Sequence, residues 1–358
     1  MNRRIVVYLC IGVVGLMSSC KLGHKFSRPV VDMPGQFDSD MNMTDTFSIA
    51  DVDWRTIYTD PELQSLIELT LANNKDLRIA EARVREMAAG KRIDTAGLFP
   101  QINGSAYVQK EGLNYGGDNY KNDPENGIKL AMSWELDLWG NLRWAKDRGS
   151  AAFMESVEGR RALQVTLIAQ VAQSYFELTA LDHELMIVRQ TLKARQEGER
   201  LAKLRFEGGL TSETSYQQAK VELERTATHV PILERNIAVK ENEIAFLAGE
   251  YFHTIKRGQD PRNIKLPDTL PVGLPSTLLE RRPDIRAAEQ ALIAANAEIG
   301  MAYTNRFPRL TLTGQFGVES DEFVDLLKSP MHFLSAGLLG PVFDMGRRQA
   351  SYRAKQAA

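Results

Sequence analysis

The sequence contains a helical pattern that is too long for any compact domain. From about residue 141 to 206 the chain has no proline, and apolar residues return at spacings of three and four, as on one face of a helix. At 1.5 Å per residue, roughly 65 residues make a helix of about 100 Å. Gly208 and Gly209 interrupt the pattern, and a second helical stretch follows over about 212–249. The two stretches predict a long antiparallel hairpin, kinked or broken at Pro231, with a narrow apolar stripe suited to coiled-coil contacts.

An internal repeat divides the rest of the chain into two copies. The stretch DLRIAEARVREMAAGKRIDTAGLFPQI, which begins at Asp76, aligns without gaps with DIRAAEQALIAANAEIGMAYTNRFPRL, which begins at Asp284. Each copy reads as an amphipathic helix, about 76–96 and 284–305, that ends at a Phe-Pro pair because proline disfavours a helical conformation in the residue before it. A strand is expected after each helix, over about 101–110 and 308–319. The repeat therefore predicts two structural copies of one unit.

A second strand is predicted in each copy. Over about 128–137 apolar and polar residues alternate, and this period of two gives a strand two different faces. The apolar face consists of Ile128, Leu130, Met132, Trp134 and Leu136, and the polar face includes Lys129, Ser133 and Glu135. The corresponding strand of the second copy is expected over about 332–343. Strands of about nine or ten residues have the length that a tilted membrane strand needs.

Two environments suit the apolar face of these strands, and patterning alone favours neither. The face can pack on helices in a soluble sandwich, or it can contact lipid. Four strands cannot close a barrel within one chain, because the smallest bacterial barrels have about eight strands and unpaired edges do not occur in lipid. Three chains that pool their strands would form a twelve-stranded barrel with a polar lumen.

The N-terminus has the layout of a secretory signal. Two arginines precede an apolar run, Ile5 to Met17, which is short for a membrane span of about 20 residues. Small residues then precede Cys20, as in the bacterial lipoprotein signal that this stretch resembles. We expect residues 1–19 to be a lipoprotein signal peptide and Cys20 to carry the lipid; the alternative is a plain signal peptide with an incidental cysteine. Because Cys10 lies in the removed segment, acylation of Cys20 leaves the mature chain without a free thiol.

Charge and motifs argue against several function classes. A net charge of −2 gives no electrostatic case for binding nucleic acid. The five histidines are scattered along the chain. No zinc-protease pair, phosphate-binding loop, dinucleotide fingerprint or nucleophile elbow is found in the sequence. We therefore expect no catalytic residues, no metal and no cofactor.

Several stretches resemble the outer-membrane efflux channel family of TolC-like channels and NodT-like lipoproteins. They are GLPSTLLERRPDIRAAEQALIAANAEIGMA followed by FPRLTLTG, SWELDLWGNLR, GPVFDMGRRQA and RFEGGLTSETSYQQA, and they extend over most of the chain from about 50 to 350. The resemblance implies a mainly α-helical chain with membrane β-strands. Two structural repeats would give a long helical hairpin and four amphipathic strands per chain, for a trimeric twelve-stranded β-barrel and a periplasmic α-barrel.

The resemblance also implies a function and partners. The chain would be the passive exit duct of a tripartite efflux system, a homotrimer anchored in outer-membrane lipid that extends into the periplasm and meets an adaptor protein and an inner-membrane pump. Gly208, Gly209, Leu210, Thr211 and Ser212 resemble the hairpin tip that docks the adaptor, although the glycines also suit a simple turn. In such a barrel the apolar residues of strand 128–137 face lipid and the polar ones face the lumen. The competing interpretation is a lipid-anchored periplasmic coiled-coil scaffold without a pore.

These expectations divide the chain into five parts. After the signal peptide, residues 20–60 form an extended lipid-anchored segment, 61–250 the first repeat with its hairpin at about 141–249, 251–275 a linker and 276–358 the second repeat. The second repeat stops before a helical hairpin of its own. By comparison with the first repeat, roughly 90 to 100 further residues are expected, so the chain reads as truncated or as a fragment.

Overall fold

The structure is a computed structural model that describes residues 21–30, 52–114, 120–258 and 280–358. The expected signal peptide, Cys20 and most of the expected linker lie outside these residues. Two compact units make up the chain. The first, called the sheet unit here, combines Met1–Val31, Arg83–Val157 and Arg286–Ala358, and the second, the hairpin unit, combines Asp32–Ala82 and Glu158–Ile285.

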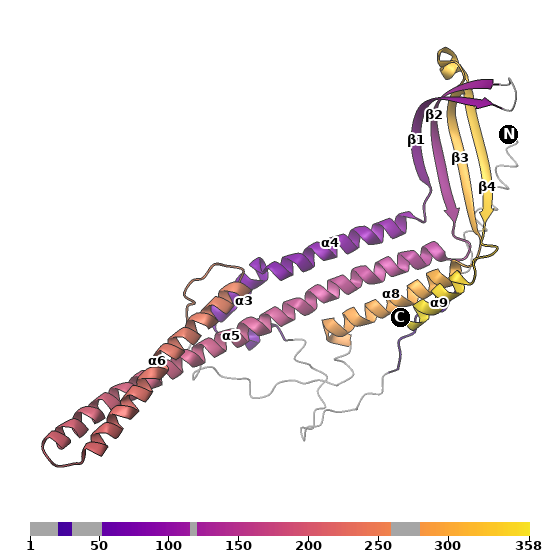
Figure 1. Ribbon diagram of the computed structural model, residues 1–358. Coiled ribbons are helices and arrows are strands. Elements are labelled where there is room, and N and C mark those ends of the chain that lie inside the picture. The colour runs from indigo at the N-terminus through magenta and orange to yellow at the C-terminus, as the bar shows by residue number, and fades with distance from the viewer. Residues whose placement is uncertain (1–20, 31–51, 115–119, 259–279) are drawn as a thin grey trace. The chain divides into compact units, whose positions relative to one another are not determined.

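Four antiparallel strands form one sheet in the sheet unit, in the order β1-β2-β3-β4 (Figure 1). Their bounds are β1 (Gln101–Asn114), β2 (Tyr120–Leu136), β3 (Arg309–Ser320) and β4 (Pro330–Leu339), and the 3-10 helix η3 (Phe323–Lys328) lies between β3 and β4. Both repeats thus contribute two neighbouring strands to a single sheet.

Each pair of strands is preceded by one helix and followed by another. The four helices are α4 (Lys75–Ala96) before β1, α5 (Asn141–Glu207) after β2, α8 (Pro283–Thr304) before β3 and α9 (Arg347–Ala357) after β4. Within the sheet unit, Arg148 of α5 pairs with Asp94 of α4 at 2.8 Å, and Lys355 of α9 pairs with Glu298 of α8 at 2.6 Å. The same helix-strand-strand-helix order therefore occurs twice.

The hairpin unit is built on two long helices. α5 runs on to Glu207, and α6 (Glu213–Leu247) returns alongside it (Figure 1). Ion pairs join the two helices, for example Lys240 with Glu177 at 2.7 Å. Of the two expectations for Pro231, a kink or a break, the break was wrong, because α6 continues through this proline. Leu233, two residues further on, is only 6% exposed, so the packed face of α6 continues past the proline, although the proline lacks a hydrogen-bond donor.

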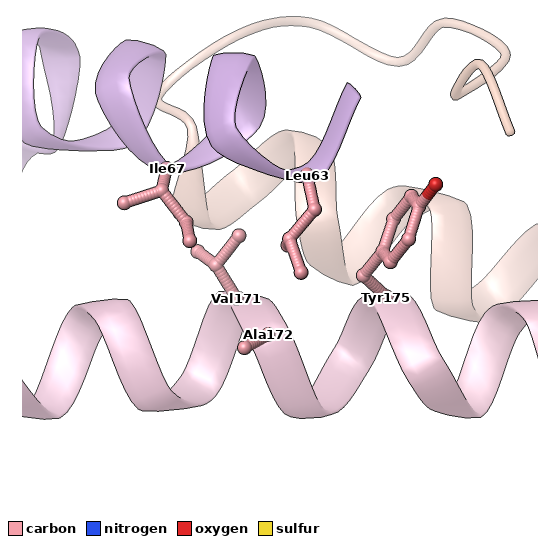
Figure 2. Close-up of a cluster of buried hydrophobic side chains, with 5 residues drawn as sticks. All are labelled: Leu63, Ile67, Val171, Ala172 and Tyr175. Atoms are coloured by element: carbon pink, nitrogen blue, oxygen red, sulfur yellow. The ribbon is translucent and has the colours of Figure 1, made fainter. Parts of the chain in front are cut away.

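A short helix completes the core of the hairpin unit. α3 (Pro61–Asn73) follows α2 (Trp54–Ile57) and is capped at its start by the Asp60 side chain, which accepts a hydrogen bond from the backbone N–H of Glu62. Leu63 and Ile67 of α3 point toward α5 (Figure 2). The resulting cluster consists of Leu63, Ile67, Val171, Ala172 and Tyr175, none more than 2% exposed. Burial of side chains the size of leucine or isoleucine contributes about 1.5–3 kcal/mol each, which fixes α3 to α5.

Candidate membrane sheet and docking tip

The strand register assigns each side chain of the sheet to one of two faces. Leu130 on β2 lies opposite Gly104 on β1 and Phe316 on β3, and Phe316 lies opposite His332 on β4. Directly opposed residues of an antiparallel pair share a face. One face, called the apolar face here, therefore collects the following residues: Ile102, Gly104, Ala106 and Val108 from β1, Ile128, Leu130, Met132, Trp134 and Leu136 from β2, Leu310, Leu312, Gly314, Phe316 and Val318 from β3, and Pro330, His332, Leu334, Ala336 and Leu338 from β4.

Much of the apolar face is left uncovered by the described chain. Phe316 and Leu334 are each 69% exposed, and Leu130 is 56% exposed. A sandwich with helices packed on this face would bury these side chains. A continuous apolar surface of this kind marks a contact with a membrane or with another protein.

The apolar residues predicted on β2 differ in exposure along the strand. Ile128 is 51% exposed, Met132 and Trp134 are half-buried, and Leu136 is only 8% exposed. The Trp134 indole N–H donates to the Leu98 carbonyl oxygen at 3.1 Å, at the turn that leads into β1. Leu136 is thus packed within its own chain and is not available to lipid. This corrects its assignment: the strand has reached the helical layer at this point, and the alternation alone does not reveal where that layer begins.

The opposite face of the sheet is mostly polar on β1, β2 and β3. Lys129, Ser133 and Glu135 all lie there, as the alternation predicts. The Tyr107 hydroxyl lies 2.6 Å from a carboxylate oxygen of Glu319 on β3 and accepts a hydrogen bond from the Lys129 ammonium at 3.4 Å. On β4 the polar character weakens, since this face also carries apolar residues there, namely Met331, Phe333 and Leu339.

Lys129, Tyr107 and Glu319 form a network that the sequence alone did not identify. Tyr107 and Glu319 are 212 positions apart in the chain, and only the strand register brings them together. Glu135 similarly lies 3.6 Å from the guanidinium of Arg309 on β3. The charges on the polar face are therefore partly compensated across neighbouring strands.

An aspartate holds each junction between strand and following helix. Asp137, just after β2, accepts hydrogen bonds at 3.0 Å from two backbone N–H groups in the first turn of α5 and pairs with the Arg143 guanidinium at 3.0 Å. Asp344, after β4, repeats this role toward α9 and its Arg348. A carboxylate at this position compensates the positive end of the helix. The signal in the sequence was the shared Asp-Gly-Arg order in DLWGNLR and DMGRR.

The five predicted tip residues, Gly208 to Ser212, connect α5 to α6. Gly209 has φ of +72°, a left-handed conformation that favours glycine. The N–H of Leu210 donates to the carbonyl of Arg205 at 2.8 Å, and the N–H of Gly209 donates to that of Phe206 at 2.9 Å, which together make a Schellman cap. The Leu210 side chain is 78% exposed. The turn thus presents an apolar side chain at the end of the hairpin on a conformationally fixed backbone.

The predicted lipid attachment point, Cys20, lies outside the residues that the structure describes. Within the described ranges, no group of three or more His, Cys, Asp or Glu residues is arranged to hold a metal ion. None of the helices described in the structure is both long enough and apolar enough to cross a membrane.

Comparison with known proteins points to one family. The model of the family described as "Outer membrane efflux protein" matches residues 66–250 and 274–358. The cation efflux system protein CusC of Escherichia coli O6:H1 (strain CFT073) is 31% identical over 346 residues, covering 94% of this chain and 73% of CusC. The probable outer membrane lipoprotein SilC of Salmonella typhimurium is 31% identical over 357 residues, covering 96% of this chain and 76% of SilC.

Solved structures are similar over the same extent. A crystal structure of CusC matches with a TM-score of 0.81 at 30% identity, covering 94% of this chain and 77% of that chain. The outer-membrane channel OprN matches with a TM-score of 0.87 at 27% identity, again covering 94% of this chain and 77% of that chain. The similarity therefore includes both the sheet and the helices.

Proposed function

The chain belongs to the outer membrane efflux protein family and is an outer-membrane channel for efflux; on this premise we propose that it is the passive exit duct of a tripartite system. An inner-membrane pump would drive the cargo, and a periplasmic adaptor would join the pump to the duct. The duct itself would then need no catalytic residue, in keeping with a family of channels rather than enzymes.

Three copies of the chain would close one barrel. The observation that carries this proposal is the exposed apolar face, which continues over all four strands. β1 and β4 are the edges of the sheet, and backbone groups at an edge need partners in hydrocarbon. Pairing β4 of one copy with β1 of the next would give twelve strands without a free edge. Ile128, Leu130, Met132 and Trp134 would then face lipid.

The polar face would line the lumen of this barrel. Lys129, Ser133 and Glu135 would contact water and cargo there, beside the Tyr107 network. Lys129 and Glu135 lie six positions apart on β2, about 20 Å at 3.3 Å per residue, so the lumen would carry its charges at separate levels.

Two further predicted sites, the lipid anchor and the docking tip, would attach the duct to the outer membrane and to the adaptor. Acylation of Cys20 would anchor the chain to the outer membrane, and the tip at Gly208 to Ser212 would dock the adaptor in the periplasm. The exposed Leu210 on a capped turn supports the second assignment, because a backbone that is already fixed loses little conformational freedom when its apolar side chain docks.

Conductance of the purified full chain in planar lipid bilayers tests this function. Discrete conductance steps are expected from wild type, together with a band on gels that dissociates to monomer only on heating. Lys129→Glu should shift the ion selectivity toward cations, measured as the reversal potential in a salt gradient. A chain that gives neither conductance nor a heat-dissociable trimer would instead be the periplasmic scaffold.

A variant at the tip separates docking from conduction. Leu210→Asp should lower efflux in cells that contain the whole system, because it replaces an apolar contact with a charge. Its conductance in bilayers should remain that of wild type. Equal efflux by wild type and by Leu210→Asp would contradict the assignment of this turn as the site that docks the adaptor.

A further inference from the structure

A hollow of about 510 Å³ lies between α4 and α5 in the sheet unit. Lys91 and Arg92 of α4 line it together with Phe99 and Phe153. The Lys91 ammonium lies 5.3 Å from the centroid of the Phe153 ring, and Phe99 is 63% exposed. Two cations and two aromatic rings thus line one hollow, and β1 begins two residues after Phe99.

The two cations are left without a carboxylate partner. In the parts of the chain that the structure describes, neither Lys91 nor Arg92 forms an ion pair. Asp94, the carboxylate that follows them on α4, is already held by Arg148 at 2.8 Å. Positive charge beside exposed aromatic rings suits a ligand that has both an anionic and an apolar part.

The repeat indicates which helix covers the hollow when copies assemble. In the proposed ring, β4 of one copy pairs with β1 of the next, so α9 of one copy lies beside α4 of the next. Within one chain, the corresponding neighbours are α5 and α8. The alignment of the two copies without gaps matches Arg92 with Gly300 and Ala96 with Thr304.

The starts of α5 and α9 correspond in the same way. Gly140 and Gly346 precede the two helices and have φ of +84° and +80°. Their carbonyls accept hydrogen bonds at 2.9 Å from the N–H groups of Trp144 and Ala350, respectively. Ala350 on α9 therefore occupies the position of Trp144 on α5.

Within one chain, a large residue on α5 meets a glycine on α8. Trp144 is only 3% exposed, and a Cβ atom added at Gly300 would come within 2.4 Å of its ring. Asn141, the first residue of α5, donates to the Thr304 hydroxyl at 2.9 Å. These two contacts fix the level at which α5 meets α8.

Repeated between copies, the same contacts place α9 over the hollow. Ala350 would lie opposite Arg92, so a small residue replaces tryptophan on one helix and a large residue replaces glycine on the other. Arg347, the first residue of α9, would lie opposite Ala96, which also lines the hollow. Arg347 is exposed and forms no ion pair within the described chain. The seam between copies thus gains a third cation.

We propose that each seam binds an anionic phospholipid, whose phosphate contacts Lys91 and Arg92 of one copy and Arg347 of the next. This inference rests on the proposed ring of three, because the site is incomplete without the second copy. Cations from neighbouring helices bind lipid phosphates in this way. The phosphate replaces the carboxylate partners that the three side chains lack.

The position of the hollow suits a lipid. Arg92 lies four residues before the end of α4, about 6 Å along the helix axis, and the layer of lipid headgroups is about 5–8 Å thick on each side of the hydrocarbon. Long basic side chains extend toward such a layer. Phe99, and Ile102 on the apolar face, which is 66% exposed, offer contacts to the acyl chains.

Native mass spectrometry of the purified full chain in detergent measures this site. With phosphatidylglycerol, an anionic phospholipid, wild-type trimers should bind one lipid at each seam, and monomers in the same spectrum should bind it about tenfold more weakly. Phosphatidylcholine has the same phosphate but carries a choline cation, so trimers should bind it about tenfold more weakly. Equal affinity for the two lipids would overturn the role of the cations, and equal binding by monomers would overturn the role of the second copy.

Three variants test the cations. Arg92→Ala and Arg347→Ala should each raise the Kd of trimers for phosphatidylglycerol about tenfold, because each removes a charge-assisted contact, and leave the Kd for phosphatidylcholine unchanged. Arg92→Lys keeps the charge and should stay within about threefold of wild type. Unchanged affinity in both alanine variants would overturn the site.

An arginine outside the seam supplies the matched control. Arg205, near the hairpin tip, is exposed and forms no ion pair within the described residues. Arg205→Ala removes the same charge as Arg92→Ala and should keep the wild-type Kd. A loss of affinity in this control equal to that of Arg92→Ala would mean that net charge, and not the seam, attracts the lipid.

Two further outcomes separate the alternatives. Excess inorganic phosphate should not displace the lipid, and displacement would overturn a phospholipid as the ligand. Trimers that conduct but bind both lipids equally count against this site alone. A chain that gives neither trimers nor conductance counts against the proposed function, and the site fails with it.

Discussion

At the scale of single residues, positions on the two faces of β2 have opposite environments. Leu130 lies on the apolar face and is 56% exposed, whereas Ser133 lies on the polar face opposite Gln101 and Thr313. We predict that Leu130→Arg lowers the free energy of unfolding in lipid vesicles by about 2–4 kcal/mol, because the charge would enter hydrocarbon. Ser133→Arg, the matched control, should cost less than about 1 kcal/mol, because water solvates it. Urea titration of the vesicle-inserted protein measures both, and equal costs would rule out the assignment of the faces.

Tyr175 gives the hairpin unit a dependence on pH. Its hydroxyl lies 2.8 Å from an Asp60 carboxylate oxygen and accepts from the Gly258 N–H at 2.8 Å. Burial, reinforced by the bond to Asp60, raises the pKa of Tyr175 to about 12 from an ordinary value of 10.0. Between these two values the unfolded chain loses the proton that the folded chain keeps, so the free energy of unfolding falls as pH rises.

Tyr175→Phe should remove this slope between pH 10 and pH 12. Below this range it should lower the free energy of unfolding by about 1–3 kcal/mol, because the Asp60 carboxylate and the Gly258 N–H lose a partner. Urea unfolding followed by circular dichroism at two pH values gives both quantities. Tyr216→Phe, near the hairpin tip, is the matched exchange and should keep the slope. A slope that persists in Tyr175→Phe would assign it to another group.

Single residues also show which features of the sheet the sequence pattern can predict and which it cannot. The alternation assigned Lys129, Ser133 and Glu135 to one face because the period of a strand is a local property. It could not pair Lys129 with Tyr107, or Tyr107 with Glu319, because those contacts depend on a register set by other strands. It also could not find that Leu136 is buried, since that depends on where the helices begin.

At the scale of elements, two glycines of the hairpin unit have opposite conformational requirements, one in the turn after α5 and one inside α5. Gly209 has φ of +72°, whereas Gly198 lies exposed inside α5 with open space around its Cα. Gly209→Ala should lower the free energy of unfolding of the hairpin unit by about 1 kcal/mol, because a Cβ is strained in the left-handed conformation. Gly198→Ala should raise it by about 0.5–1 kcal/mol, because alanine favours the helix. Thermal unfolding followed by circular dichroism compares them, and a shift in the same direction would contradict the cap.

The start of β2 and the end of β4 differ from the predicted positions, and each difference has a local cause. β2 begins at Tyr120, earlier than the expected 128, because a stretch rich in Gly, Asn and Asp that is typical of turns is paired with β1. β4 ends at Leu339, earlier than the expected 343, just before Gly340 and Pro341. Proline lacks the N–H that a ladder requires, and this outweighs the apolar residues that follow it. The alternation of apolar and polar residues was enough to predict that the strands exist. The positions of their ends depended on pairing with other strands and on one proline.

At the scale of the whole molecule, the repeat explains why one sheet needs both halves of the sequence. β1 and β2 come from the first copy and β3 and β4 from the second, and the central contact joins β2 to β3. β1 and β4 each have a partner strand on only one side, so they are the edges of the sheet. A repeat that pairs its copies within one chain can pair them again between chains, and this is the physical basis for the proposed ring of three.

Cysteines at the two edges test that ring. Ser105 on β1 and Gly337 on β4 both lie on the polar face. Within one chain three strand spacings separate these strands, about 14 Å, and a disulfide needs Cα atoms closer than about 7 Å. Ser105→Cys combined with Gly337→Cys can therefore form a disulfide only between copies. Because Cys10 and Cys20 are the only cysteines of the sequence, an acylated mature chain adds no competing thiol.

Oxidation of this double variant in membranes should give bands of one, two and three chains on a non-reducing gel. Partners at Ser335 and Leu339, tested in the same way with Ser105→Cys, scan the register between copies, and the strongest cross-link identifies it. Ser133→Cys with Ser335→Cys is the control, since β3 lies between those strands and no disulfide should form. Bands larger than three chains would mean that the edges join without closing. Absence of cross-links at all three β4 positions would mean that β1 and β4 are not partners, and the exposed apolar face would then need another explanation than a closed barrel in lipid.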